Sequence, residues 1–539
     1  MSKEKQKKNK VTIFLLRDGI SIENFINGTP TCKAISENKK FFYTTKLPTP
    51  AKWLDFFKDK LSDLKDLFKI ILPQGLLIIT DVDCGDAKKS FAITFGSGIH
   101  LLNQDAYVER FGLKVLLNII DEFGLRKISQ KSMRGIPSDS VKQLSKISSI
   151  RDFDLDITQD FVINLTASPE EEDLPLFGKN VTGGNSLSVS ILNDIDDVED
   201  FLKKCYKKYT DIRYKKNYAW IDNVRPETNT NKTKRLKEIL IKKIRTNDVD
   251  RIWMSIPEMI NWEEVSGFTF HKRGKLRYDI ELKDFLDEVV KDISKFDEKY
   301  LKRNVFVLDS NGCQKFTWKI YRCLYAEVEY DRRTYILNAG KWFEVNYDYL
   351  IELDKKYNEI IQESKKYDLS LPNSKSGEHE GEYNKRVGEE FKEYYLTLDR
   401  KLVSLAGNSG VEVCDIYSKN KDFIHVKKYG ASSVFSHLFM QGKNSAELFL
   451  LSQEYRNEIK KILSEGFEVS SERPNPNDYK IIYAVITKYA NTEKDKIPFF
   501  SKISLCATKK YLNDLGFSNV YMKSIPIDKA NASENSDKS

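Results

Sequence analysis

The chain has 539 residues, with 40% apolar and 12% aromatic side chains, and its formal net charge is +8. This length exceeds what one hydrophobic core supports, so we expect several domains, and no apolar run is long enough to cross a membrane. The mildly basic charge permits a nucleic-acid partner without requiring one, and we expect a protein of the cytoplasm with no membrane partner.

The first part of the chain is predicted to be an α+β domain over residues 11–175, behind a basic tail at residues 1–10. The run VTIFLLRDG predicts a strand ended by a turn, and PAKWLDFFKDKLSDLKDLFKI has the spacing of an amphipathic helix. Two more strands are expected in GLLIITDVDCGDAKKSFAITFG, and the next helix in YVERFGLKVLLNIID.

A second α+β domain is predicted over residues 176–370. It begins with helices around residues 194–216 and 231–246 and continues with a β-meander in TWKIYRCLYAEVEYDRRTYILNAGKWFEVN. The Asn-Ala-Gly sequence at residues 338–340 is expected to turn the last hairpin of this meander. A charged helix then leads to a linker at residues 371–382.

A third domain is predicted over residues 383–526, followed by a disordered tail at residues 527–539. Its pattern predicts a helix, two strands, a helix, a strand, a helix and a final strand. The first helix is expected over residues 383–403, and the two strands that follow it over residues 411–417 and 423–428.

These two strands are expected to pair as a hairpin about the polar turn at residues 418–422. The turn places Asp415 opposite His425, and Lys427 lies two residues further along the second strand. Because side chains alternate along a strand, these three polar groups are expected to share one face. The opposite face is apolar and is expected to enter the core; it contains Cys414, Ile416, Ile424 and Val426.

A carboxylate from the preceding helix is expected to join the polar face. Glu390 lies at the edge of the apolar stripe of that helix, and Glu382 is the other candidate acid. Carboxylate oxygens are the ligands that Mg²⁺ prefers, and Lys427 can offset charge on a phosphate that is being hydrolysed. The sequence therefore predicts a Mg²⁺ or Mn²⁺ site, with Asp415, His425 and Glu390 as metal ligands.

The predicted order is a helix, a strand that carries Asp415, a strand that carries Lys427, and a second helix. This order resembles the core of the restriction-endonuclease-like superfamily. The resemblance covers roughly residues 380–525. It implies a multidomain α+β protein with a C-terminal restriction-endonuclease-like α/β core. By this resemblance Asp415 binds the metal, Lys427 orients water or phosphate, and Gln441 supports the phosphate or the nucleophile.

One residue departs from the pattern of that superfamily. His425 stands where its members carry an acid, and an imidazole ligand suits Mn²⁺ better than Mg²⁺. Glu412 could replace the missing acid, but by strand parity it points to the other face unless a bulge re-aims it. A cross-strand pair of Asp415 and His425 is also a normal surface contact, so the sequence equally fits a surface hairpin that has no catalytic role.

A second resemblance spans nearly the whole chain. The segments VTIFLLRDG, FGLKVLLNIID, YKKNYAWIDNVRP and VEVCDIYSKNKDFIHVKKYGASSVFSHLFMQGKNSAELFL follow in this order. They resemble signature segments of a sporadically distributed bacterial family of unknown function. This resemblance implies the patchy distribution of defence genes, and its signature is densest between Asp415 and Gln441.

Several polar residues outside the hairpin face are candidates for contacts with nucleic acid. Two serines and a lysine follow the hairpin and open a helix, whose N-terminus can hold phosphates. One pair of lysines lies beside aromatic residues, a combination that suits single-stranded nucleic acid, although the rings could instead enter the core at a helix end. Another basic pair lies in the stretch HKRGKLRYD, which would suit duplex phosphate contacts or be only a charged hairpin tip. The candidates are Lys428, Ser432, Ser433, Lys215, Lys216, Lys272 and Arg273.

The expected function is metal-dependent hydrolysis of nucleic-acid phosphodiesters in bacterial defence against phage or foreign DNA. The alternative is a non-catalytic nucleic-acid-binding or sensor protein on a degenerate nuclease scaffold, which His425 favours. An acyl hydrolase that uses Ser436 and His437 is disfavoured, because the sequence lacks a G-x-S-x-G elbow. The sequence leaves open a protein partner or a homo-oligomer, and does not distinguish DNA from RNA.

Overall fold

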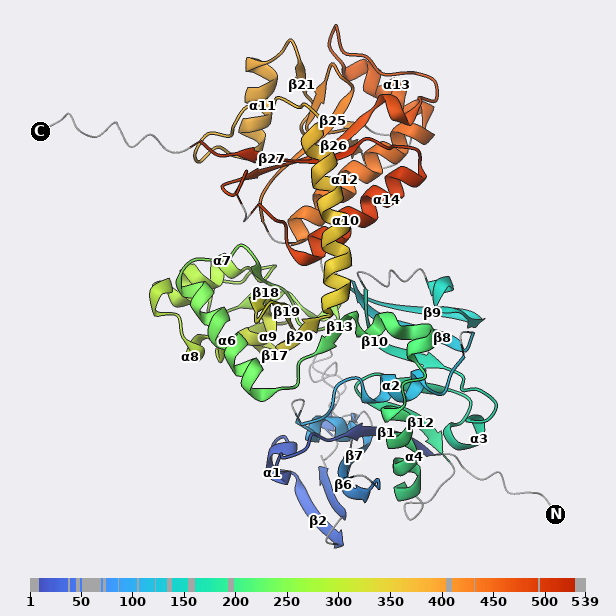
Figure 1. The fold of residues 1–539 in the computed structure, drawn as a ribbon. Coiled ribbons are helices and arrows are strands. Elements are labelled where there is room, and N and C mark those ends of the chain that lie inside the picture. The colour runs from blue at the N-terminus through green and yellow to red at the C-terminus, as the bar shows by residue number, and fades with distance from the viewer. Residues whose placement is uncertain are drawn as a thin grey trace, which may run out of the picture. The chain divides into compact units, whose positions relative to one another are not determined.

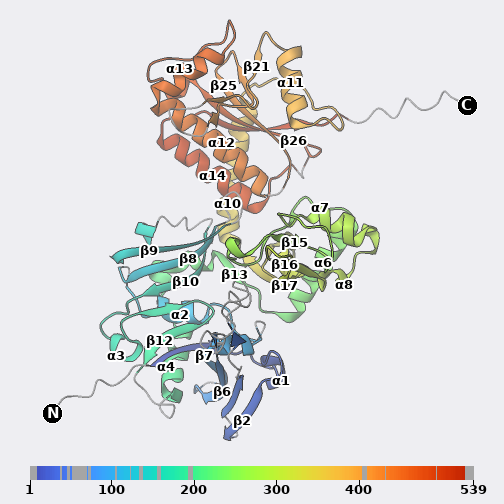
Figure 2. The ribbon, with the colours of Figure 1, turned by 180° about the vertical axis from the view of Figure 1, so that it is seen from behind.

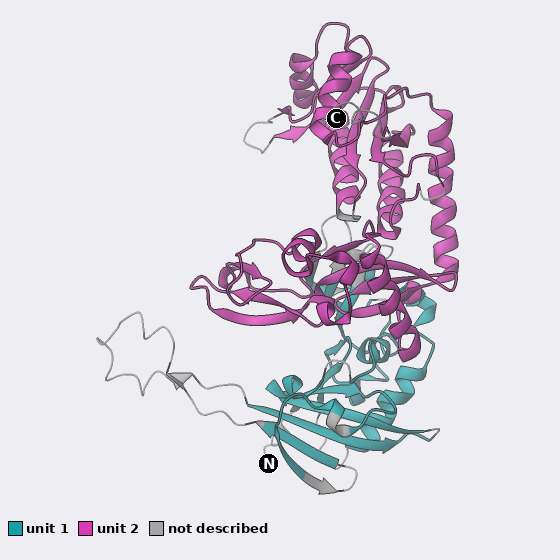
Figure 3. Cartoon of the chain, turned by 90° about the vertical axis from the view of Figure 1, so that its left-hand side faces the viewer, with its two compact units in different colours: residues 1–131, 140–221 teal, residues 132–139, 222–539 magenta. Residues whose placement is uncertain are grey.

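The protein is described by a computed structural model that divides into two compact units (Figure 3). Unit 1 covers residues 1–131 and 140–221, and unit 2 covers residues 132–139 and 222–539. The fold is mixed α+β with several sheets. No helix in the described part of the chain has the length and apolar character needed to cross a membrane. The described residues are 9–36, 39–44, 49–50, 69–70, 74–85, 87–103, 106–121, 123–132, 138–153, 160–191, 198–403, 410–430, 432–492 and 495–528.

Unit 1 is built on a ten-stranded sheet in the order β2-β3-β6-β7-β1-β12-β11-β10-β8-β9 (Figure 1). β1 lies between β7 and β12, antiparallel to both, and is buried on both faces, which explains its continuous apolar sequence. The strands are β1 Asn9–Leu15, β2 Thr31–Ser36, β3 Lys39–Thr44, β6 Gly75–Asp83, β7 Lys88–Gly96, β8 Leu125–Ser132, β9 Ser138–Ser148, β10 Asp160–Ala167, β11 Val181–Gly183 and β12 Leu187–Ile191, with β4 Thr49–Pro50 and β5 Lys69–Ile70 as a separate pair.

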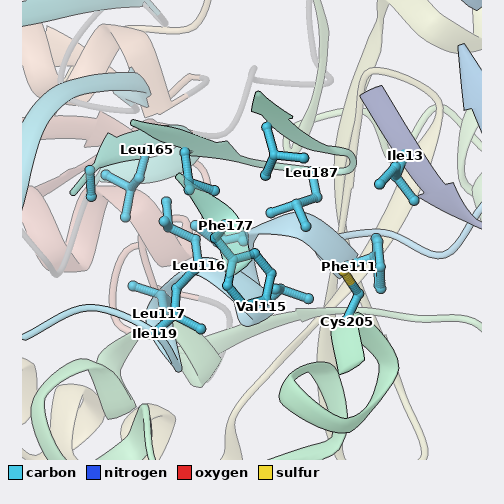
Figure 4. Packing of buried hydrophobic residues seen from close by; sticks show 14 of the residues in the cluster. Ile13, Phe111, Val115, Leu116, Leu117, Ile119, Leu165, Phe177, Leu187 and Cys205 are labelled. Carbon is cyan, nitrogen blue, oxygen red and sulfur yellow. The ribbon is translucent and has the colours of Figure 1, made fainter. Parts of the chain in front are cut away.

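The core of unit 1 forms where helix α2 (Phe111–Leu117) packs on this sheet (Figure 4). A Cβ atom added to Gly112 would lie 1.9 Å from the Ser186 carbonyl oxygen, so only glycine permits this close approach. α2 is shorter than the sequence predicts, since Arg110 before it is left-handed with φ 58°. The other helices are α1 Ile22–Phe25, α3 Leu174–Phe177, α4 Val198–Thr210 and α5 Lys215–Tyr218.

Two sequence predictions for this part of the chain need comment. The predicted domain boundary at residue 175 falls inside the sheet, because β11 and β12 follow it and pair with β10 and β1. The predicted helix in PAKWLDFFKDKLSDLKDLFKI falls largely outside the described residues, as do most residues of the two predicted tails.

The first half of unit 2 contains a five-stranded sheet, β13-β20-β19-β18-β14, and a three-stranded sheet, β15-β16-β17. The predicted meander is confirmed, and Ala339 and Gly340 turn its last hairpin with φ 51° and 82°. The elements are β13 Val224–Pro226, α6 Thr230–Arg245, β14 Ile252–Met254, β15 Gly267–Thr269, α7 Leu282–Phe285, α8 Glu298–Leu301, β16 Asn304–Leu308, β17 Gln314–Lys319, α9 Ile320–Cys323, β18 Leu324–Tyr330, β19 Arg333–Asn338, β20 Lys341–Val345 and α10 Tyr347–Lys366.

The second half of unit 2 has a five-stranded mixed sheet, β21-β24-β25-β26-β27, in which the last three strands are parallel. Helix α11 covers one face and helices α12 and α14 cover the other (Figures 1 and 2). The elements are α11 Glu380–Glu390, β21 Tyr395–Thr397, β22 Leu402–Val403, β23 Val411–Glu412, β24 Ile416–Ser418, β25 Asp422–Lys428, α12 Ser432–Leu451, α13 Gln453–Ile462, β26 Lys480–Thr487, α14 Phe499–Asp514 and β27 Val520–Pro526.

The predicted helix over residues 383–403 is wrong in its second half. α11 ends at Glu390, and the chain then turns into β21. Phe391, Tyr394 and Leu402 have the spacing of one helical face, but Tyr394 and Leu402 are 62% and 63% exposed. The predicted linker at residues 371–382 is also partly structured: Ser374 pairs with Ile527, and α11 begins at Glu380.

Candidate metal centre

The hairpin of β24 and β25 forms with the register expected from its turn. Ile416 pairs with Ile424, and Tyr417 pairs with Phe423. β24 begins only at Ile416, because Asp415 lies in a bend that separates it from β23. The Asp415 Oδ2 atom accepts a hydrogen bond of 2.7 Å from the N–H of Val426, so the carboxylate is fixed against β25.

Three carboxylates converge at this bend. Asp399, Glu412 and Asp415 each place one oxygen within 4.8 Å of the other two, and together they could hold a metal ion. Asp399 follows β21, Glu412 ends β23, and Asp415 precedes β24. The group, which we call the acidic triad, is thus assembled from three separate chain segments. No other such group of three is found in the described ranges.

Two hydrogen bonds hold Glu412 in the acidic triad. Its Oε1 atom accepts from the N–H of Arg400 at 2.7 Å, and its Oε2 atom accepts from Gln441 Nε2 at 2.9 Å. Strand parity predicts that Glu412 points away from Asp415, but the break in the strand at residues 413–415 cancels that parity. Gln441, which the superfamily resemblance singles out, therefore meets the triad through Glu412.

Asp415 is the most buried member of the acidic triad, with 9% of its surface exposed. The pKa of Asp415 is raised to about 7, chiefly by burial and also by the nearby Glu412 and Asp399 carboxylates, while the Val426 N–H and Lys427 act in the opposite direction. A carboxyl group with this pKa is only partly ionised at neutral pH. A cation held by the triad would favour the ionised form, so binding would release a proton.

Asn384 of α11 lies beside Asp415 and is 1% exposed. Its Nδ2 atom donates to Asp415 Oδ1 over 3.4 Å, while its Oδ1 atom finds no partner among the described residues. A buried acceptor without a partner is costly, and it is a good ligand for a hard cation or for the water around one. The three carboxylates of the acidic triad could therefore hold a metal ion, with the Asn384 side chain beside Asp415.

Lys427 is held at this site by a glutamate that the sequence does not single out. Glu380, the first residue of α11, accepts from Lys427 Nζ at 2.8 Å and from the Lys428 N–H at 3.0 Å. Burial disfavours the charge of Lys427, but Glu380, Asp415 and Glu412 outweigh it and raise its pKa above the ordinary value. Lys427 is thus charged and oriented.

The two helix acids predicted from the sequence lie elsewhere. Glu382 accepts from the N–H of His379 at 2.8 Å and completes a capping box at the start of α11. Glu390 pairs with Arg386 at 3.2 Å and with Lys375 at 3.7 Å at the other end of the helix. The structure brings neither of them to Asp415, because the helix presents Glu380 and Asn384 there instead.

His425 does not join the acidic triad. It is 1% exposed, its ring centroid is 6.1 Å from that of Tyr483, and no described residue bonds its Nε2 atom. It alternates with Ile424 and Val426, so it shares the face of β25 that packs beneath α12, with Phe423. Cys414 is predicted to lie on the opposite face of the hairpin from His425. It instead lies in the core cluster beneath α12, and this prediction is also wrong.

Burial of His425 should make the protein sensitive to acid. Burial lowers the pKa of His425 from 6.5 to about 3. Because the unfolded chain binds this proton more tightly, the stability due to the neutral imidazole is lost as pH falls below about 6.5. Through this histidine, the free energy of unfolding of the wild-type protein should fall by about 2 kcal/mol between pH 7 and pH 5. His425→Leu should not show this part of the fall.

This prediction is checked by urea unfolding at the two pH values. His437→Leu is the matched control, because His437 is exposed on α12. If both variants lose the same stability on acidification as the wild-type protein, the account of His425 is wrong.

The predicted nucleic-acid contacts have mixed positions. Lys215 and Lys216 are exposed on α5, but their aromatic neighbours Tyr214 and Tyr218 are 4% and 1% exposed and belong to the core of unit 1. Lys272 and Arg273 are exposed in unit 2, and Lys428 is half-buried at the end of β25. The side chains of Ser432 and Ser433 lie outside the described part.

Comparison with known proteins gives one match. The model of a family of unknown function, DUF6119, matches residues 11–526 of the chain. No curated protein and no solved structure matches the chain. The match extends across both units, and its range includes every member of the acidic triad.

Proposed function

The chain belongs to this family of unknown function, and we propose that the second half of its unit 2 hydrolyses nucleic-acid phosphodiesters with a divalent cation. The observation that carries the proposal is the acidic triad beside a charged lysine. Mg²⁺ and Mn²⁺ are the ions that such oxygen ligands favour. Because His425 lies outside the triad, its nitrogen gives no reason to prefer Mn²⁺.

The order of elements supports the finer proposal of a restriction-endonuclease-like core. α11 is followed by three antiparallel strands, β21, β24 and β25; α12 then leads to β26, which is parallel to β25. Asp415 precedes the second of these strands and Lys427 lies near the end of the third, as in the motif of that superfamily. Glu412 occupies the role of the acid that His425 does not supply.

Each residue of the site has a distinct task in this proposal. Asp399, Glu412 and Asp415 would hold the cation, which when bound supplies an acidified water and a polarised phosphate. Lys427 places a fixed positive charge where the phosphate gains negative charge. Glu380 and Gln441 are positioning residues, since one holds Lys427 and the other holds Glu412.

The proposal is tested by incubating the purified full-length protein with labelled DNA and RNA, single- and double-stranded, in Mg²⁺, Mn²⁺ or EDTA. We expect cleavage with metal by the wild-type protein and by Glu389→Gln, whose carboxylate pairs with Lys385 on the exposed side of α11. Asp415→Ala should not cleave, and Lys427→Ala should cleave at least about a hundredfold more slowly than the wild-type protein. Equal cleavage by all four proteins, or none under any condition, would overturn the proposal. A role in defence against phage or foreign DNA is proposed from the family resemblance and not from the geometry of the site.

A second candidate is a nucleic-acid-binding or sensor protein without catalysis. This candidate is favoured by His425, which stands at the position where the superfamily carries an acid. His425 is buried in the core and so does not replace that acid at the site. Binding that falls with salt, without cleavage in any metal, would distinguish this candidate from the nuclease.

A further inference from the structure

A short hairpin in the first half of unit 2 projects a basic tip. Phe268 and Arg277 form an isolated antiparallel bridge, with backbone hydrogen bonds of 2.8 and 2.9 Å in the two directions. Between them, the N–H of Gly274 donates to the carbonyl of His271 at 3.0 Å and closes a turn. The tip over residues 271–278 is thus held by defined backbone contacts.

The base of the hairpin is anchored by Arg277. Its guanidinium pairs with Asp284 and with Glu288, and its side chain is 17% exposed. The nearby carboxylate of Glu264 is paired with Lys315. Arg277 thus balances one of its two carboxylate partners, and His271 Nε2 lies 3.8 Å from Glu288 Oε1, so these carboxylates are tied to the base of the hairpin.

Three basic side chains at the tip are exposed to solvent. Lys272, Arg273 and Lys275 are exposed, and among the described residues no carboxylate lies within ion-pair distance of any of them. The stretch HKRGKLRYD contains four Lys or Arg residues and one Asp. Such a cluster suits phosphate groups, which release counterions when they bind.

Two exposed aromatic rings flank the same bridge. Tyr278, which follows Arg277, is 81% exposed. Trp262 is 54% exposed and packs edge-on against Phe268, with ring centroids 6.0 Å apart. Rings with so much exposed surface contribute little to the core, and they are available to stack on flat ligands.

We propose that this hairpin tip binds single-stranded nucleic acid. Lys272, Arg273 and Lys275 would contact backbone phosphates, and Tyr278 and Trp262 would stack on bases. A duplex keeps its bases stacked on each other, so it offers phosphates to the cations but no base to the rings. The inference deepens the proposed function, on which it rests for the identity of the substrate, but the binding itself requires no metal.

The test is fluorescence anisotropy of the full-length protein with labelled oligothymidine, oligouridine and a duplex, in EDTA so that cleavage cannot contribute. Tyr278→Ala should weaken single-strand binding about tenfold. The triple change Lys272→Ala, Arg273→Ala and Lys275→Ala should weaken it and lower the slope of log affinity against log salt by about 2.

Matched controls remove the same groups from α10. Tyr347→Ala removes a 57% exposed ring, and Lys355→Ala with Lys365→Ala and Lys366→Ala removes three exposed charges. Both controls should bind single strands as the wild-type protein does.

The outcomes separate this inference from the proposed function. If the tip variants bind as the wild-type protein does, or if Tyr278→Ala weakens duplex and single-strand binding equally, the hairpin assignment is overturned while cleavage can stand. If the tip variants lose binding and the wild-type protein never cleaves, the hairpin holds and the nuclease falls. If the wild-type protein binds no oligonucleotide, the hairpin assignment fails and a protein partner becomes the candidate for this surface.

Discussion

Asp415→Asn is expected to abolish metal-dependent cleavage while making the metal-free protein more stable. The substitution removes a ligand that we assign to the cation, and loss of several kcal/mol of metal stabilisation lowers the rate by about a thousandfold or more. It also removes a carboxylate whose charge is unfavourable at its buried position near Glu412 and Asp399. The asparagine can still accept from the Val426 N–H, and its amide can donate to the free Oδ1 of Asn384.

The stability gain should depend on pH in a defined direction. Folding raises the pKa of Asp415 from 3.8 to about 7, so the folded state binds this proton more tightly than the unfolded chain. The wild-type protein therefore loses stability as pH rises from about 4 to about 7, and the asparagine variant does not. At pH 8 we expect the variant to be more stable by about 2 kcal/mol, and at pH 4 by little.

Urea unfolding in EDTA at several pH values, beside a cleavage assay, checks both parts of this prediction. Mn²⁺ at 100 times its dissociation constant should stabilise the wild-type protein by about 2.7 kcal/mol and leave the variant unchanged. A variant that loses both activity and stability would indicate a structural role for Asp415 and would count against the metal centre.

Lys427→Ala is expected to lower the rate of cleavage by about a hundredfold to a thousandfold while metal binding is retained. Lys427 is placed to act on the phosphate, whereas the acidic triad holds the cation without it. Binding of Mn²⁺, followed by its effect on unfolding, should therefore persist. Loss of metal binding together with activity would show that Lys427 supports the triad instead.

The removal of Lys427 also leaves Glu380 without its partner, and this second effect needs its own control. The double variant Lys427→Ala with Glu380→Gln removes both charges and should remain as slow as Lys427→Ala alone. Lys385→Ala, which breaks only an exposed pair with Glu389 on α11, should cleave at the wild-type rate. Recovery of activity in the double variant would mean that the stray carboxylate, and not the missing lysine, slows the reaction.

Local sequence patterns predicted those parts of the fold that depend on local chemistry. The turn SKNKD set the register of Ile416 with Ile424, and the Asn-Ala-Gly sequence turned the last hairpin of the meander. Apolar runs such as KIIYAVIT became the buried β26. In each case the residues that specify the element lie within a few positions of each other.

The acidic triad could be predicted only in part, because two of its members lie where the sequence pattern misplaces a helix end and a strand break. Asp415 was found from its hairpin, but Asp399 lay inside a stretch that helical spacing assigned to α11. Parity pointed Glu412 away, and the break at residues 413–415 that reverses this leaves no clear signal in the sequence. Glu380 was missed because the predicted linker at residues 371–382 included it, whereas α11 begins there.

His425 shows the opposite case, a residue whose type suggested chemistry that its surroundings do not support. The alternation of β25 places it on the same face as Phe423, in the core beneath α12. The spacing of His425 and Lys427 in FIHVKK is the same for a site residue and a core residue, so only the packing of the sheet distinguishes them.

The most direct test of the metal-dependent nuclease is the single-turnover rate of cleavage of a labelled single strand as Mn²⁺ is titrated at neutral pH. The account predicts a rate that rises from zero in EDTA and saturates with Mn²⁺ for the wild-type protein, and no rise for Asp415→Asn. Cleavage that is independent of metal, the same curve for both proteins, or no cleavage of DNA or RNA at any Mn²⁺ concentration would contradict it.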